Sequence, residues 1–186
     1  MARIRLQWPV IIAILVVLAT AGIGGAVYSE TSPFCGSCHE MKQYYDTWKV
    51  SSHGPERLKG NKTVKDGEVG CHACHSWPGL DGYVKTKMVG MNEVVKHVTG
   101  NYKTPIQGEP VEERCLECHV TAKITQTEQV KIPHLKHEEM NLKCMDCHGG
   151  MVHGRQGEGE IRVGHEACNK CHDTQDTNAC TSCHKW

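Results

Sequence analysis

Cysteine and histidine supply most of the chemistry available to this chain. Its 186 residues include 12 Cys and 13 His, and every cysteine belongs to a C-x-x-C-H motif that occurs six times. Two thiols at this spacing form thioether bonds to one haem, while the adjacent imidazole ligates the iron. The chain therefore predicts six covalently bound haem c groups. The motifs are Cys35-Cys38-His39, Cys71-Cys74-His75, Cys115-Cys118-His119, Cys144-Cys147-His148, Cys168-Cys171-His172 and Cys180-Cys183-His184.

Zinc sites and disulfides are the alternatives to haem. Zinc ribbons pair C-x-x-C motifs, and a disulfide framework also uses an even number of cysteines. Neither of them requires a histidine after every second cysteine. At the histidine frequency of this chain, six such histidines would arise by chance about once in ten million. Haem is the favoured interpretation.

A second axial ligand is expected for each iron that transfers electrons without binding substrate. Seven histidines besides those that close the motifs, together with Met41, are candidates for that position. The seven are His53, His72, His97, His134, His137, His153 and His165. His72 lies inside the loop of its own motif and is the weakest candidate. With ligands for nearly every iron, the chain is expected to conduct electrons and to do little chemistry at the metal.

The remaining composition agrees with a core made of cofactor. One Phe, four Trp and five Tyr are too few aromatic side chains for a conventional core of this length. Six porphyrins spread over residues 30–186 leave about 26 residues for each haem. The 21 Lys and Arg balance the 21 Asp and Glu, so the basic excess of a nucleic-acid-binding protein is lacking and no nucleic-acid partner is expected.

The elements around these motifs must position them, and the first such element along the chain is an apolar segment. Residues 6–29 carry no charge, a run that reaches roughly 36 Å as a helix and is long enough to cross a bilayer. Trp8 and Tyr28 stand near its two ends, as aromatic residues do at membrane interfaces. Arg3 and Arg5 precede the run and predict a cytoplasmic N-terminus, with the haem domain in the periplasm of a bacterium.

A cleaved signal peptide is the alternative for this run, because Ala19-Thr20-Ala21 resembles a cleavage site. The apolar stretch continues past that point as far as Val27, which a spanning helix needs and a signal peptide does not. A retained single-pass anchor in the inner membrane is therefore favoured.

Beyond the anchor, the sequence predicts a mainly α fold with extensive loops. An apolar stripe with helical spacing predicts a helix that ends before Gly100, a residue suited to a C-cap. A second helix is expected through Met41 and Trp48. Strand signals are nearly absent. The stripe consists of Val84, Met88, Met91, Val95 and Val98.

Two segments carry a family resemblance. Cys35-Gly-Ser-Cys38-His39-Glu40-Met41, with Ser51-Ser52-His53 after it, resembles the NapC/NirT family of membrane-anchored multihaem quinol dehydrogenases. The segment from Lys143 to His153 resembles the fourth haem segment of that family. The likeness covers residues 1–153, whereas the typical member has four haems and this chain has two further motifs. We therefore expect an anchor (1–29), a tetrahaem domain (30–153) and a dihaem extension (154–186).

The resemblance also implies ligands. Met41 would be an axial ligand of the first haem. His53 would serve the fourth haem and His153 the second, while His134 or His137 would serve the third. His97 and His165 are candidates for the additional irons.

The quinol site of the family lies beside the first haem, on the segment that follows the second motif. Lys85, Lys87 and Glu93 occupy that segment here. A lysine there would orient a quinone oxygen, and a carboxylate would accept a proton as the quinol is oxidised. The alternative for each of them is a solvated position on a helix.

Three functions fit these features. The leading hypothesis is a quinol dehydrogenase that passes electrons from membrane quinol along six haems to a periplasmic oxidoreductase or cytochrome. The second is a non-catalytic relay subunit that works with other subunits of a respiratory quinone-reductase complex. A terminal reductase is the weakest, because it needs an iron with an open position and ligands are plentiful here.

Overall fold

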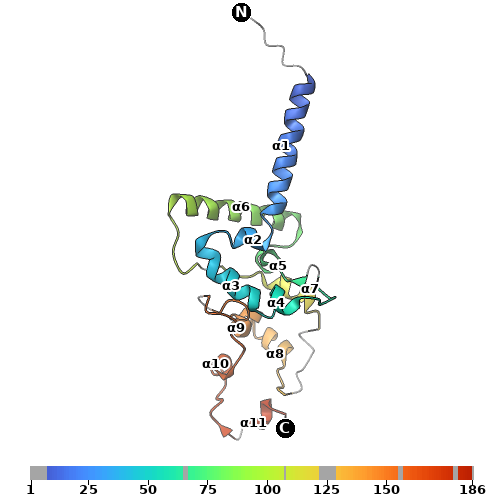
Figure 1. The fold of residues 1–186 in the computed structure, drawn as a ribbon. Helices are drawn as coiled ribbons and strands as arrows, with labels where there is room; N and C mark the ends of the chain where they lie inside the picture. Colours follow the sequence, from blue (N-terminus) through green and yellow to red (C-terminus); the bar gives the residue numbers. More distant parts are fainter. Residues whose placement is uncertain are drawn as a thin grey trace, which may run out of the picture.

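The computed structural model describes residues 8–64, 67–106, 108–121, 129–154, 157–177 and 180–185. One long helix projects from a body made of a second long helix, shorter helices and loops (Figure 1). The predicted mainly α fold is confirmed, because an isolated bridge between Val130 and His184 is the only β-pairing within the described ranges. Arg3 and Arg5, on which the predicted orientation rests, lie outside the described residues.

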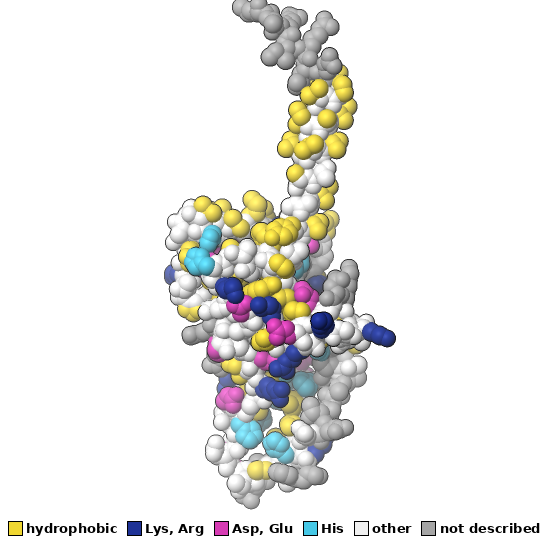
Figure 2. All heavy atoms as spheres, viewed as in Figure 1, with side chains coloured by type: hydrophobic (Ala, Val, Ile, Leu, Met, Phe, Trp, Pro, Cys, Tyr) yellow, Lys and Arg dark blue, Asp and Glu magenta, His cyan; other side chains and the backbone are white. Residues whose placement is uncertain are grey.

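The projecting helix is α1, Trp8–Tyr28. Its mean hydropathy reaches 2.7, and none of its residues is buried against the rest of the protein. A helix of this length spans the hydrocarbon core of a bilayer. Its apolar side chains have no protein to cover them, in agreement with the predicted anchor (Figure 2).

The second long helix is α6, Gly79–Thr99, which runs crosswise at the foot of α1 (Figure 1). It contains the predicted apolar stripe, and it begins five residues before that stripe, directly after Pro78. Gly100 closes it with φ 69°, a left-handed conformation that costs glycine little. The predicted helix and its C-cap are both confirmed.

The third helix of more than two turns is α3, Lys42–Val50, where the sequence predicts its second helix. Tyr44 and Trp48 turn inwards from it and are 8% and 3% exposed. The Trp48 indole Nε1 donates to the carbonyl of Val69 at 2.8 Å. This aromatic pair is the centre of the small peptide core below the membrane helix.

Short helices carry the rest of the chain, and most of them coincide with a haem motif. They lie between the foot of α1 and the far end of the molecule, with α2 and α5 nearest α1 and α11 farthest from it (Figure 1). They are α2 (Ser32–Cys35), η1 (His39–Met41), α4 (Pro55–Leu58), α5 (Cys71–His75), η3 (Glu112–Arg114), α7 (Cys115–Cys118), α8 (His134–Glu139), α9 (Cys144–His148), α10 (His165–Cys168) and α11 (Cys180–Cys183).

Candidate haem centres

A single helical turn shapes most of the C-x-x-C-H motifs. Helices α5, α7, α9 and α11 each begin at the first cysteine of a motif, whereas α2 and α10 end at it. Where the turn includes both cysteines, the two thiols stand three residues apart on one face. In the third, fifth and sixth motifs the backbone amide of the closing histidine donates to the carbonyl of the first cysteine, at 2.8–2.9 Å. This bond fixes the histidine close beneath its own cysteine pair.

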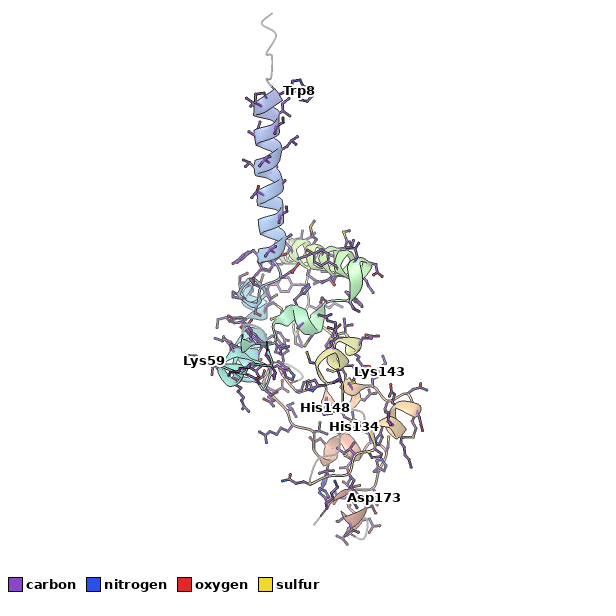
Figure 3. All side chains as sticks on the ribbon, turned by 90° about the vertical axis from the view of Figure 1, so that its right-hand side faces the viewer. Trp8, Lys59, His134, Lys143, His148 and Asp173 are labelled. Atoms are coloured by element: carbon purple, nitrogen blue, oxygen red, sulfur yellow. The ribbon has the colours of Figure 1, made fainter. Side chains whose placement is uncertain are left out.

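Each motif histidine lies beside a second histidine from another part of the chain. In five of these pairs the two imidazole rings are in direct contact, with centroids 5.7–6.5 Å apart. The sixth pair, His134 and His148, interacts electrostatically and comes from α8 and α9 (Figure 3). The five ring pairs are His39–His97, His75–His153, His53–His119, His137–His172 and His165–His184.

This spacing fits an iron held between two imidazoles. Metal–nitrogen bonds of about 2 Å on each side place the two ring centres roughly 6 Å apart. The protonation states fit as well, because burial lowers the pKa of His53, His75, His148 and His153. A lowered pKa keeps an imidazole neutral, which is the form that binds metal.

The pairs differ from the ligand scheme that the family resemblance implies. His53 lies against the third motif, not the fourth, and His134 lies against the fourth. His137 and His165 face the two additional motifs, while His153 faces the second motif as the resemblance implies. The loops between motifs set this arrangement, and motif order along the chain does not reveal it. Ligation itself stays a prediction.

The first motif is paired with His97 from α6, where the resemblance implies Met41. The two rings of His39 and His97 are 5.8 Å apart, and the ring of Tyr102 stacks on His97. The side chain of Glu40 is 5% exposed, and its Oε1 lies 2.7 Å from His97 Nδ1. A carboxylate on Nδ1 leaves Nε2 to face a metal. Glu40 gave no signal in the sequence beyond its place next to the motif.

His72 has no place in these pairs. Six pairs use twelve of the 13 histidines, and His72 is the one left. Its Nε2 is buried and has no hydrogen-bond partner among the described residues. Burial lowers its pKa, and the nearby Glu30 carboxylate opposes that shift.

The cysteine pairs follow one another in space. Helix α2 contacts α5, α5 contacts η3 at the start of the third motif, and α9 contacts α10. Thiols of successive motifs also interact: Cys35 with Cys71, Cys74 with Cys118, Cys115 with Cys144, and Cys168 with both Cys147 and Cys183. The six motifs therefore form one series that runs from the foot of α1 to α11.

The three residues proposed for a quinol site do not come together. Lys85 lies over the Trp77 ring, 3.9 Å from its centroid, beside a cavity of about 350 Å³. Glu93 pairs with Lys96 at 2.7 Å and is more than half exposed. Lys87 turns to the end of α1. Positions 85 and 87 of one helix point about 200° apart, so they cannot share a site on it.

Lys87 is the centre of a polar cluster between α6 and the end of α1. Its Nζ donates to the Ala26 carbonyl at 2.9 Å and the Ser29 hydroxyl at 2.8 Å, and it pairs with Glu30 Oε1 at 2.9 Å. The Lys87 ammonium holds the pKa of Glu30 below its usual range. Its charge also acts on Cys35 of the first motif. The sequence did not point to Glu30 as a site residue, although Glu30 directly follows the apolar run.

Known proteins show similarity over most of the chain. A model of the N-terminal region of the NapC/NirT cytochrome c family matches residues 2–158. The cytochrome c-type protein ImcH of Geobacter sulfurreducens is 30% identical over 56% of this chain and 20% of its own length. The cytochrome c-type protein TorC of Escherichia coli is 27% identical over 92% of this chain and 37% of its own length. The chain thus spans much less than half of these two relatives.

Two further matches are closer to this chain in length. The cytochrome c nitrite reductase subunit NrfH of Nitratidesulfovibrio vulgaris is 27% identical over 76% of this chain and 78% of the relative. Among solved structures, the cytochrome c nitrite reductase NrfHA complex bound to the HQNO inhibitor contains a similar chain. It matches with a TM-score of 0.50 and 23% identity over 77% of this chain and 88% of that chain. This likeness supports the fold.

Proposed function

The chain belongs to the NapC/NirT cytochrome c family, and from this premise we propose that it carries electrons from membrane quinol through six haems to a periplasmic redox partner. As a family member it is a c-type cytochrome with covalently attached haem and a transmembrane anchor. The count of six haems, the direction of transfer and the partners belong to the proposal. The anchor would hold the chain in the inner membrane with the haem domain on the periplasmic side.

One observation carries the proposal: every motif histidine faces a second imidazole, in a series that starts at the foot of α1. Bound haem would supply a one-electron carrier at each pair. The protein would contribute two neutral imidazoles per iron and would keep neighbouring motifs in contact. An arrangement with two ligands at each iron favours electron transfer over a terminal reductase, which needs an open coordination position.

The quinol would be oxidised beside the first motif, at the cluster around Lys87. Lys87 is 27% and Glu30 33% exposed, so both remain within reach of a ligand at the membrane surface. The ammonium would orient a quinol oxygen, and the Glu30 carboxylate, held ionised by Lys87, would accept one of the two protons that quinol oxidation releases, the other passing to solvent. Lys85 and Glu93 lie away from this cluster, so the proposal retains only Lys87 from the three residues named from the sequence.

The electron acceptor would dock at the far end of the series. The fifth and sixth motifs lie beyond residue 158, where the family match ends. An extension of this kind also favours the second candidate, a relay subunit inside a larger respiratory complex. Copurification of further membrane subunits, together with no quinol oxidation by the isolated chain, would favour that alternative.

Quinol-dependent reduction tests the proposal. The full-length holoprotein in lipid nanodiscs is mixed with menaquinol or ubiquinol, and haem reduction is followed by absorbance. Intact mass first establishes that six haems are attached. We expect reduction by at least one quinol; haems that stay oxidised with both, yet respond to dithionite, would refute the donor role.

A pair of lysine variants locates the quinol site. Lys87→Gln should slow quinol-dependent reduction on the order of tenfold or more, because the orienting charge is lost. Lys85→Gln removes the same charge from the other side of α6 and should leave the rate unchanged. Equal effects of the two substitutions would contradict the role of Lys87.

A further inference from the structure

Helix α6 carries a broad apolar face, and the described protein leaves most of it exposed. Eight side chains of this face project within an arc of about 140° on a helical wheel. Four of them, Leu80, Met88, Met91 and Val98, are 67–81% exposed. The eight are Leu80, Tyr83, Val84, Met88, Met91, Val94, Val95 and Val98. Lys87 is the one charged residue within this arc, and it is bound to α1.

The opposite side of α6 is packed against the haem domain. Gly82 is buried there, and a Cβ at that position would meet the Trp77 carbonyl oxygen at 2.6 Å. Thr86 accepts a hydrogen bond from the Trp77 amide, and His97 contacts Glu40. The packing direction of the helix is therefore fixed, and the apolar face points away from the domain.

The position of α1 determines what lies against the apolar face of α6. Lys87 ties α6 to Ala26, Ser29 and Glu30, where the last turn of α1 ends. Helix α6 thus lies at the level where α1 leaves the hydrocarbon, and hydrophobic side chains line its upper edge as they line α1 (Figure 2). A soluble partner on this face would have to enter the headgroup layer.

We propose that the apolar face of α6 is a membrane-surface anchor that lies in the interface between headgroups and acyl chains. A helix with one apolar and one polar face buries the former about 5–10 Å deep at this boundary. The occupant is lipid, continuous with the lipid around α1. With α1 vertical and α6 flat, the first motif and the Lys87 cluster are held at headgroup depth. The proposal does not depend on quinol oxidation.

Methionine footprinting tests this contact on the full-length holoprotein in nanodiscs that hold one chain each. Met88 and Met91 are each 67% exposed, and Met140, far from α1, is 61% exposed. Trypsin releases the first two in residues 88–96 and the control in residues 137–143, and neither peptide contains a haem-bound cysteine. We expect hydroxyl radicals to oxidise Met88 and Met91 several-fold less than Met140. Equal oxidation would overturn the proposal.

Matched variants on the same helix distinguish lipid from other causes of protection. Val95→Asp puts a charge in the apolar face and should raise oxidation of Met88 and Met91 several-fold. Val89→Asp makes the same change at an exposed position outside the arc and should leave the oxidation as it was. The haem content of each variant is measured by mass, so that only protein with its haems attached is compared. Protection that appears only in discs with two copies would overturn the proposal in favour of a contact between chains.

Discussion

The two ends of the haem domain are built in different ways. Within the described ranges, every buried residue lies between Ser32 and Val111, around the aromatic pair of α3. From residue 112 onward no described residue is buried, and the helices there have three to six residues. Helices this short do not persist in water by themselves. The membrane-proximal region has a peptide core of its own, whereas we expect the distal region to depend on bound haem for its order.

Removal of the last haem is the strongest way to break this comparison. With Cys180→Ala and Cys183→Ala, we expect residues 180–185 to lose most of their protection from hydrogen exchange, because the backbone bonds of this segment to residues 129–131 are the only other tertiary backbone bonds it makes among the described residues. The matched change, Cys35→Ala with Cys38→Ala, should leave α3 protected, since its core contains Trp48. Hydrogen exchange measured by mass spectrometry reports the protection of both segments. A distal region that stays protected without its haem would refute the difference.

A second test deletes a side chain from each region. Trp48→Ala should cost about 3–5 kcal/mol of unfolding free energy, because a 3% exposed aromatic ring is removed and the Val69 carbonyl loses its donor. Ile161→Ala should cost roughly 1 kcal/mol, since Ile161 is 39% exposed. Chemical denaturation followed by circular dichroism compares them. Similar costs would show that the distal region also has a peptide core.

The histidine pairs at the two ends should both bind iron, but among the described residues only the first pair has a buried carboxylate beside its distal ring, that of Glu40 beside His97. His97→Ala and His165→Ala should each convert one low-spin haem to high spin, whereas Met41→Leu should convert none. Electron paramagnetic resonance distinguishes these outcomes. High-spin haem in the Met41 variant would reinstate the ligand that the family resemblance implies.

The carboxylate itself offers a finer comparison. Glu40→Gln should raise the potential of one haem by about 60 mV or more, because loss of a carboxylate on Nδ1 makes His97 a weaker donor to ferric iron. Redox titration of the whole chain should show one shifted haem. Unchanged potentials would mean that Glu40 does not act on a haem ligand.

The smallest effect concerns the Lys87–Glu30 pair that joins the two long helices. The folded pKa of Glu30 is lowered, so its contribution to stability is present above the unfolded value and is lost as pH falls through the folded one. Glu30→Gln should therefore cost under about 1 kcal/mol near neutral pH, as partly exposed pairs do, and almost nothing in acid. Melting temperatures of the unchanged protein and the variant, measured near neutral pH and in acid, check this. A cost that grows in acid would contradict the sign.

Local patterns predicted the elements well. Residues 6–29 predicted α1, and the apolar stripe with Gly100 predicted α6 and its cap, because helical periodicity and capping act within a few residues. The site was predicted in part. The seven extra histidines were singled out as candidate ligands, but the structure places His53 beside the third motif where the resemblance implies the fourth, because the path of the loops brings His53 there. Lys85, Lys87 and Glu93 share a helix but point to different surroundings.

The sequence by itself determined the covalent chemistry, because a C-x-x-C-H motif is complete within five residues, and it determined the anchor, because length and hydropathy need no partner. Tertiary structure alone decided which imidazole faces which motif, that Glu40 lies beside His97, and that α6 with its exposed apolar face lies at the level of the foot of α1. Contacts of this kind join residues tens of positions apart, and no local spacing encodes the path of the chain between them.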